Sequence, residues 1–408
     1  MARPVATVTV SVQPVSGAAT VTMQGTGAET VPGAVAALVD GIERGLHPGA
    51  LVYVSLDGEP VAHLGIGEAR AGRPMEPDQM VIWFSMTKPS VAIAVAQQWE
   101  RGALELDDPV VRHVPEFGAH GKHTITVRHL LTHTAGIRGA DAVESSAPGD
   151  RYWDEVVAGI CAIEPEADWV PGARAGYHLT SGMTVLAEIV RRLDGRRFET
   201  YVRDEVFLPL GMDDCWVGMP PDRAEAYGDR LGTMHKTTTG RPIPLRAFDT
   251  SAFLRRCIPG GGGRGPARQL GRLYEALLAH GELAGNRVLL PQTVEALTAR
   301  HRVGLYDETY HVPCDWGLGF AIDAFAMGRH SSPRAFGHGG ALSAISFADP
   351  EHRLVGVVQV NGMCSNDDHY LRMDAVTSAL YEDLGFADAG AAGREKPFPS
   401  VDLTVSID

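Results

Sequence analysis

The chain has 408 residues, of which 44% are hydrophobic, so it can form one large domain or two with a sizeable core and is not a wholly disordered protein. The formal net charge of -14 excludes the basic footprint that a nucleic-acid partner needs. The first ten residues have no continuous apolar run and no later stretch approaches a membrane span, so we expect a soluble, cytoplasmic protein without a membrane partner.

The five cysteines are scattered along the chain, and no pair has the C-x-x-C spacing. This pattern favours neither a disulfide framework nor a zinc site. We expect free or buried thiols in a reducing compartment.

The first elements in chain order are strands and one helix. Residues 5–24 alternate Val with Thr, Ser and Gln, which predicts a strand-like N-terminal extension over 1–28. Apolar residues from Val35 to Leu46 then have the spacing of an amphipathic helix. Two strands follow, over 50–56 and 60–66, and Asp57-Gly58 between them is a strong signal for a β-hairpin.

Ser85 and Lys88 stand three residues apart in Ser85-Met86-Thr87-Lys88. Positions three apart lie on one face of a helix, so the hydroxyl and the amine can meet as nucleophile and base. Pro89 predicts that a helix begins close to Ser85, because proline is tolerated in the first helical turn. Every residue from 91 to 96 is apolar, which predicts a helix buried on all sides that could hold the Lys88 amine dry and lower its pKa.

The middle of the chain, over 105–254, reads as helical segments separated by long loops, including a short helix that ends at Gly136. Helices near 267–280 and 291–299, strand-like runs over 317–322, 343–348 and 353–360, and a closing helix from Met373 to Leu384 follow. Strands at both ends of the chain predict one sheet region, over 29–104 and 255–385, with 105–254 inserted as a mainly helical region. The tail over 386–408 is expected to include a strand from 402 to 407.

Several stretches in order carry a resemblance to the serine β-lactamase-like superfamily, in particular to class C β-lactamases, family VIII esterases and related acyltransferases. The resemblance covers roughly residues 30–385. It rests on residues 84–88, 102–109, 129–136, 171–172 before Tyr177, 209–212, the glycine loop at 260, 316–320 and 337–340. It implies an α+β fold of the β-lactamase and penicillin-binding-protein transpeptidase type, an antiparallel sheet flanked by helices with an inserted all-helical region.

The same resemblance implies how the site is built. Ser85 and Lys88 form its first element, Tyr177-His178-Leu179 stands where the family has Y-x-N, and His338-Gly339-Gly340 stands where it has K-T-G on an edge strand. Ser85 would attack a carbonyl, with either Lys88 or Tyr177 as the formal base. The resemblance places the oxyanion between the backbone N–H groups of Ser85 and Ala341, and the two glycines would let substrate lie close to the strand.

Two differences from the family's motifs narrow the class of substrate that we expect. Leu179 offers no side-chain amide to a β-lactam or peptide, and His338 is at most partly charged where the family has lysine, so it would hold a carboxylate weakly. We therefore expect a serine-dependent acyl-enzyme hydrolase or acyltransferase for esters, thioesters or related small acyl substrates, with a possible alcohol or amine acceptor. The alternatives are a β-lactamase or D-Ala-D-Ala carboxypeptidase and, from another class, a catalytically inactive binding or sensor protein on the same scaffold.

Other motifs have plainer interpretations. His129 and His133 lie four apart, but no third ligand accompanies them, so we predict no metal. The glycine loop over 260–263 lacks the G-K-[ST] ending of a phosphate loop, and we predict no cofactor. Trp153 follows a polar, loop-like stretch over 139–150, where specificity commonly resides, and is a candidate wall of the substrate pocket. The oligomeric state is not predicted.

Overall fold

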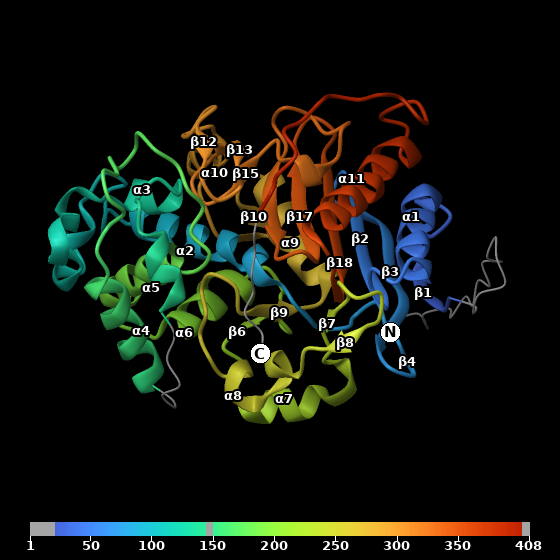
Figure 1. Cartoon of the computed structure of the whole chain (residues 1–408), viewed down its shortest axis with the longest axis horizontal. Helices are drawn as coiled ribbons and strands as arrows, with labels where there is room; N and C mark the ends of the chain where they lie inside the picture. The colour runs from blue at the N-terminus through green and yellow to red at the C-terminus, as the bar shows by residue number, and fades with distance from the viewer. Residues whose placement is uncertain (1–20, 144–149, 402–408) are drawn as a thin grey trace.

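The structure, a computed structural model, describes residues 21–143 and 150–401 (Figure 1). The predicted extension over 5–20 and the predicted strand over 402–407 lie outside the described residues. Of the N-terminal extension, the structure describes strand β1, Met23–Thr26, which pairs with β3 at one edge of the main sheet.

The main sheet has nine strands, and every neighbouring pair is antiparallel. Their order is β1-β3-β2-β18-β17-β16-β15-β14, with β4 attached to β3, so strands from the two ends of the chain meet where β2 pairs with β18. The remaining strands are β2 Gly49–Leu56, β3 Glu59–Arg70, β4 Arg73–Pro74, β14 Asp315–Trp316, β15 Ala321–Ile322, β16 Phe336–Gly340, β17 Ala344–Asp349 and β18 Leu354–Val360.

Local sequence explains the hairpins of this sheet. Asp57 and Gly58 both have positive φ, as a two-residue turn of the primed type requires, which confirms the predicted hairpin. Of the predicted strand over 317–322, only Ala321–Ile322 is a strand, β15, and residues 317–320 are not. Gly319 has a φ of 84° in a turn between β14 and β15, and a side chain there would meet Ala92 at 2.5 Å.

Helices cover both faces of the sheet. Side chains of β2 alternate: Val52 and Val54 pack toward α1, Pro32–Glu43, and α11, Asn366–Asp383, whereas Leu51 and Tyr53 belong to the core shared with α2 and α9. Figure 1 shows α1 and α11 side by side at one end of the molecule. The other helices are α2 Lys88–Glu100, α9 Ala267–Leu278 and α10 Pro291–Thr298.

The region between α2 and α9 is mainly helical; its helices α3, α4 and α5 lie on the side of Figure 1 away from α1, and α7 and α8 lie at the bottom. It contains α3 Val127–Leu131, α4 Asp150–Ala162, α5 Ser181–Asp194, α6 Phe198–Val202, α7 Pro221–Tyr227 and α8 Ser251–Leu254. Shorter turns of helix are η2 Val110–Arg112, η3 Pro115–Thr124, η4 Arg138–Ala142, η5 Arg203–Phe207, η6 Gly228–Arg230 and η7 Arg246–Asp249, with η8 Phe325–Met327 later in the chain. The domain boundaries at 104 and 254 remain a prediction.

Further short strands lie outside the main sheet. They are β5 Val81–Ile82, β6 Trp216–Val217, β7 His235–Lys236, β8 Ile243–Pro244, β9 Gly263–Gly265 and β19 Gly362–Met363, with hairpins β10 Glu282–Leu283 to β11 Asn286–Arg287 and β12 Tyr306–Asp307 to β13 Val312–Pro313. In the small sheet β5-β9-β6, Ile82 pairs with Arg264 just before the chain reaches Ser85. Within residues 21–143 and 150–401, no helix is long and apolar enough to cross a membrane.

Candidate active site

Ser85 lies on a 3-10 turn, η1 Phe84–Thr87, that leads directly into α2. Pro89 occupies the first turn of α2, and residues 91–96 are all buried, as the sequence predicted. Phe84 has a φ of 48°, an unfavourable backbone conformation for a side chain of this size. The Thr87 hydroxyl ties the turn down, since it donates to the Phe84 carbonyl at 2.6 Å and accepts from the Gly263 N–H at 2.8 Å. The fold thus holds Ser85 partly exposed among buried neighbours.

The Lys88 amine has three polar neighbours. Its Nζ lies 2.8 Å from Oγ of Ser85, 2.7 Å from the Leu179 carbonyl oxygen and 2.7 Å from the Gly260 carbonyl oxygen. Carbonyls only accept hydrogen bonds, whereas a hydroxyl can also donate one. The three partners can accept the three N–H bonds of an ammonium. They also suit a neutral amine, whose two N–H bonds point at the carbonyls while its lone pair accepts from the Ser85 hydroxyl.

Burial favours the neutral amine. The Lys88 side chain is fully buried, and this burial lowers its pKa to about 7, with the Asp141 carboxylate partly opposing the shift. Near pH 7 a large fraction of the amine is therefore unprotonated and able to accept the Ser85 proton.

Tyr177 lies against the same amine. Its ring centroid is 5.0 Å from the Lys88 Nζ, and it packs against Tyr310 at 5.0 Å and Trp316 at 5.7 Å between centroids. Burial raises the pKa of the Tyr177 phenol, and the nearby Ser85 hydroxyl offsets only part of that rise. The buried phenol therefore stays protonated at neutral pH, and within the described residues its oxygen has no hydrogen-bond partner.

Two carboxylates that sequence reasoning missed hold this arrangement. Asp141 accepts hydrogen bonds from the backbone N–H groups of Leu179, Thr180 and Ser181 at 2.7–2.8 Å, which fixes the Leu179 carbonyl beside the lysine. Asp307 accepts from the Tyr177 N–H at 3.1 Å. Nothing in the sequence links either acid to these loops, because each lies tens of residues away from its partners.

Asp307 is itself held by a buried ion pair with Arg302, at 3.0 Å. The Gly260 carbonyl was also missed, because the sequence of a glycine loop does not show which of its carbonyls will face a lysine. A side chain at Gly260 would meet the Thr180 Cα at 2.7 Å, so the glycine allows the two loops that face Lys88 to touch.

Strand β16 carries His338, Gly339 and Gly340 next to the turn of Ser85. It lies between β15 and β17 rather than at the sheet edge, which β14 occupies. A Cβ at Gly340 would meet the Trp83 carbonyl oxygen at 2.5 Å, whereas one at Gly339 would meet only Ala344 O, at 3.6 Å. Gly340 thus permits the close approach of strand and turn, and Gly339 leaves space on the strand surface.

The backbone N–H groups of Ser85 and Ala341 donate no hydrogen bond within the part of the chain that the structure describes. Each neighbours a residue with positive φ: Phe84 at 48°, and Leu342 at 48°. The carbonyl of Leu342 accepts a hydrogen bond from the buried Arg372 guanidinium at 3.0 Å, which holds this turn from α11. Two free N–H groups on turns held in this way suit a developing oxyanion.

The Gly340→Ala variant is expected to lose about 1–3 kcal/mol of unfolding free energy, because the new methyl group displaces β16 from Trp83. Gly339→Ala is the matched control, and a much smaller loss is expected there. Denaturant unfolding of both variants measures the difference. Equal losses would contradict the role given to Gly340.

His338 is neutral in this site. Its Nδ1–H donates to the Gly339 carbonyl at 2.8 Å, which leaves Nε2 as the acceptor. Burial and the neighbouring Lys88 amine lower the pKa of His338 to about 3. The ring is therefore uncharged at neutral pH, within the expectation that it is at most partly charged, because it is buried beside another potential cation.

Leu179 and Trp153 were predicted as substrate-site residues, and their side chains lie elsewhere than on the Lys88 amine. Leu179 faces the lysine with its backbone carbonyl, and its side chain is 38% exposed. Trp153, on α4, donates from its indole N–H to Glu188 at 2.7 Å and lines a separate cavity of about 710 Å³. Ser85, Lys88 and Tyr177 do not line that cavity, so the structure does not bring Trp153 together with them.

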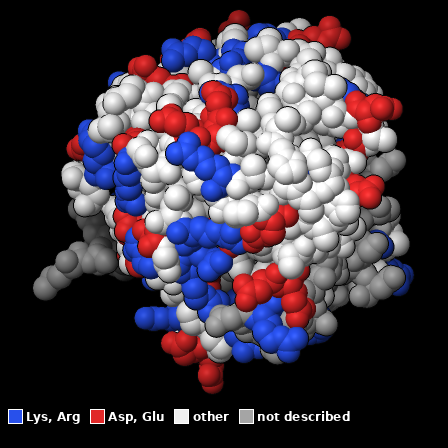
Figure 2. Space-filling model, turned by 90° about the vertical axis from the view of Figure 1, so that its left-hand side faces the viewer, with Lys and Arg blue, Asp and Glu red and all other residues white. Residues whose placement is uncertain are grey.

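The surface near α3 and α4 mixes both charges. Figure 2, seen from the side of these helices, shows basic side chains gathered next to acidic ones. Arg192, for example, forms ion pairs with Glu116 and with Glu188. Among the described residues, no group of three or more His, Cys, Asp or Glu could hold a metal ion. His129 instead caps α3, where its Nδ1 accepts from the Thr126 N–H at 3.1 Å.

With this geometry in hand, comparison with known proteins decides the family. The model of the Beta-lactamase family matches residues 34–381. The chain belongs to this family. The esterase/beta-lactamase LipL of Mycobacterium tuberculosis is 30% identical over 331 residues, which cover 74% of each chain. The esterase EstB of Burkholderia gladioli is 31% identical over 296 residues, covering 67% of this chain and 74% of EstB.

A crystal structure of a family VIII carboxylesterase has a TM-score of 0.76 and 28% identity to this member of the Beta-lactamase family, covering 89% of this chain and 100% of that one. The predicted superfamily and the α+β fold are confirmed. The prediction of a serine acyl-enzyme hydrolase or acyltransferase agrees with these relatives, which are esterases and β-lactamases.

Proposed function

We propose that the protein hydrolyses or transfers the acyl group of a small, neutral ester or thioester through an acyl-enzyme on Ser85. The hydrogen-bond set of the Lys88 amine carries this proposal. This amine lies 2.8 Å from the Ser85 hydroxyl and is held there by two carbonyls, and its pKa of about 7 suits proton transfer at neutral pH.

In the proposed reaction, the Ser85 oxygen bonds to the substrate carbonyl carbon while its proton passes to the Lys88 amine. The N–H groups of Ser85 and Ala341 would hold the resulting oxyanion. The protonated phenol of Tyr177 would donate to the departing alkoxide or thiolate and recover a proton from Lys88. Water, an alcohol or an amine then attacks the acyl-enzyme by the reverse sequence, which releases Ser85.

The charge of the site favours neutral substrates. Penicillins carry a carboxylate that a lysine commonly holds, but His338 is uncharged here and Leu179 offers only a backbone group and an apolar side chain. Gly339 leaves space on the strand for an ester without adding any charge. We therefore place β-lactam and D-Ala-D-Ala peptide turnover second.

The compartment and the acceptor belong to the same proposal. Among the described residues the five cysteines are unpaired thiols, and four of them are buried, which supports the reducing cytoplasm as the compartment. An alcohol or amine acceptor in place of water needs only a nucleophile that reaches the acyl-enzyme. Product analysis with added alcohols, asking whether transfer outcompetes hydrolysis, tests the acceptor.

The substrate class has a direct test. Short p-nitrophenyl esters are expected to give a burst of p-nitrophenol, a fluorophosphonate probe is expected to label Ser85, and nitrocefin turnover is expected to be at least about 100-fold slower than ester turnover, the size of effect that a lost charged contact produces. Nitrocefin turnover as fast as ester turnover would overturn the preference for esters. The absence of both burst and label would favour a binding or sensor protein.

A further inference from the structure

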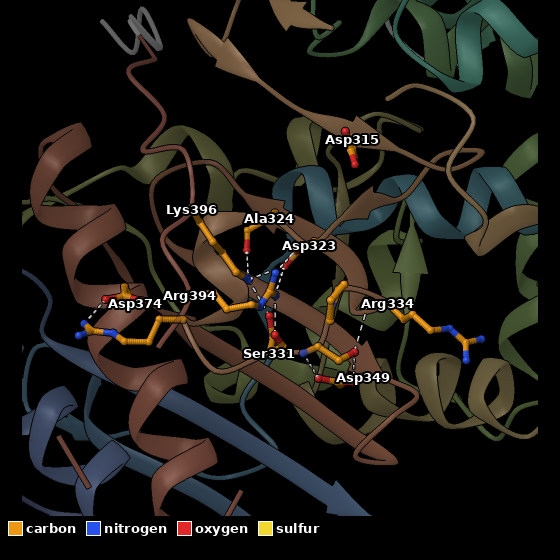
Figure 3. Close-up of polar contacts among 12 residues, drawn as sticks. Asp315, Asp323, Ala324, Ser331, Arg334, Asp349, Asp374, Arg394 and Lys396 are labelled. Atoms are coloured by element: carbon orange, nitrogen blue, oxygen red, sulfur yellow. Dashed lines mark hydrogen bonds and ion pairs between the residues drawn. The ribbon is translucent and has the colours of Figure 1, made fainter. Parts of the chain in front are cut away.

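The C-terminal segment after α11 is docked on the edge of the main sheet. Figure 3 shows Arg394 and Lys396 pointing toward Asp323, which follows β15. Arg394 donates to both oxygens of Asp323, at 2.7 and 2.5 Å, and the Lys396 amine lies 2.9 Å from the same carboxylate. Lys396 also donates to the Ser331 hydroxyl at 2.6 Å, and its side chain is only 4% exposed. The anchor thus combines a buried lysine with a partly exposed arginine on one carboxylate.

Beyond the anchor, three further contacts fix the segment. The Phe398 ring lies edge-on to Phe325, with centroids 5.0 Å apart. The Pro399 carbonyl accepts from the Asn366 side chain at 3.0 Å, and the Ser400 N–H donates to the Tyr310 carbonyl at 2.9 Å. The segment therefore connects α11 and the sheet edge to Tyr310, whose ring packs on Tyr177.

A cavity of about 240 Å³ lies beneath this segment. Pro397 and Pro399 form one wall, and most of the remaining lining is apolar. The lining also includes Tyr310, Asp315, Asp323, Ala324, His338 and Gly339.

The charged residues that line this cavity are paired with residues of opposite charge. Asp323 is paired with Arg394 and Lys396, and Asp315 is paired with Arg300 at 2.7 Å. His338 is neutral. The lining therefore suits an uncharged apolar group, and at roughly 30 Å³ for each water-sized group the volume holds about eight such groups.

The cavity adjoins the proposed catalytic centre. His338 and Gly339, on β16, line it two to three residues before Ala341. The Tyr177 ring lies 5.8 Å from the His338 ring and 5.0 Å from the Tyr310 ring, between centroids. His338 and Tyr310 thus line the cavity and also lie against the Tyr177 ring.

We propose that this cavity binds the alkyl arm of the ester, and that the docked segment over 394–400 limits the length of that arm. The inference rests on the proposed function, because it assigns the apolar part of that same substrate. Each methylene buried in an apolar site raises affinity roughly fourfold. A cavity that takes about four to six carbons would therefore discriminate strongly between esters of different chain length. The alkyl arm belongs either to the acyl group or to the alcohol, and both have the same chemistry.

The Ala324→Phe variant of the full chain tests the inference, because the new ring fills the cavity from its floor. The ratio of kcat/KM for p-nitrophenyl hexanoate to that for the acetate is expected to fall at least about tenfold, following the loss of two or more buried methylenes. A parallel series of alkyl acetates varies the alcohol instead. A fall in one series alone identifies which arm occupies the cavity, and no fall in either series overturns the proposal.

Glu395→Ala is the matched control, since Glu395 lies on the same segment, is exposed and does not line the cavity. Its chain-length ratio is expected to equal that of the unmodified protein. An equal fall in this control would overturn the proposal, because the segment would then act by its general stability.

A second measurement uses the unmodified protein and so does not depend on the folding of a variant. Crystals of the unmodified protein labelled with a hexylphosphonate and with a phosphonate ester of hexanol should have the hexyl chain of one of them under Pro397 and Pro399. A chain in the solvent or in another cavity in both would overturn the inference while leaving the acyl-enzyme intact. If Ser85 takes no label, the proposed function fails. A hexanamide soak then tests the cavity alone. Ligand density in the cavity would support an alkyl-binding site, and no ligand density there would overturn that site.

Discussion

Replacing Ser85 with alanine is expected to lower kcat for p-nitrophenyl butyrate by a factor of about 10⁴ to 10⁶, the range for loss of a covalent nucleophile. The reason is that, among the described residues, the Ser85 hydroxyl alone is hydrogen-bonded to the Lys88 amine, whose Nζ is 2.8 Å from the Ser85 Oγ. Steady-state release of p-nitrophenol measures the loss, and fluorophosphonate labelling should disappear with it.

Ser90→Ala is the control for this experiment, because Ser90 lies on the same buried helix and donates from its hydroxyl to the Thr87 carbonyl at 2.6 Å, away from the amine. We expect this variant to keep activity within a few-fold of the original. A Ser85→Ala protein that retained more than a tenth of the original rate would exclude an acyl-enzyme on this residue.

The second large effect concerns Lys88 and pH. Its pKa is lowered to about 7 by burial, and only the unprotonated amine can accept the serine proton. Activity should therefore be low below pH 6, rise through a midpoint near 7 and level off above pH 8. Lys88→Met is expected to lower kcat by about 10²- to 10⁴-fold, the contribution typical of a general base, and to abolish this midpoint.

The chain offers a matched control in Lys122, another buried lysine. Its amine donates to three carbonyls, those of Ala119, Cys161 and Ile163, so no partner is left that could give it a proton. Lys122→Met should reduce stability and leave the pH midpoint where it was. A midpoint that survived Lys88→Met would assign the titration to another group, and a near-normal rate in that variant would end the role of Lys88 as base.

Local sequence was enough to predict much of the framework. The three-residue spacing of Ser85 and Lys88, followed by Pro89 and an apolar run, predicted a buried helix that begins at the nucleophile, and the structure has that helix. Asp57-Gly58 predicted its hairpin because a two-residue turn depends on the φ angles of those residues alone. The order of several short motifs predicted the family, which the family comparison confirms over residues 34–381.

The sequence was a poor guide to the run over 317–322. Its alternation resembles a strand, but Gly319 turns there to approach α2, and that contact lies more than 200 residues away along the chain. Local pattern cannot anticipate a turn that another element imposes. Trp153 is a similar case, because a tryptophan after a polar loop says nothing about which cavity the helix will face.

The protein's sequence by itself therefore determined many of the elements, the family and the pairing of a nucleophile with an amine, because these depend mostly on neighbours in the chain. Only the tertiary structure decided the chemical state of the site. The carbonyls of Leu179 and Gly260, the carboxylate of Asp141 and the burial of His338 come from distant segments. Proton affinities depend on dehydration and on charges a few ångströms away, and those distances exist only after the chain has folded.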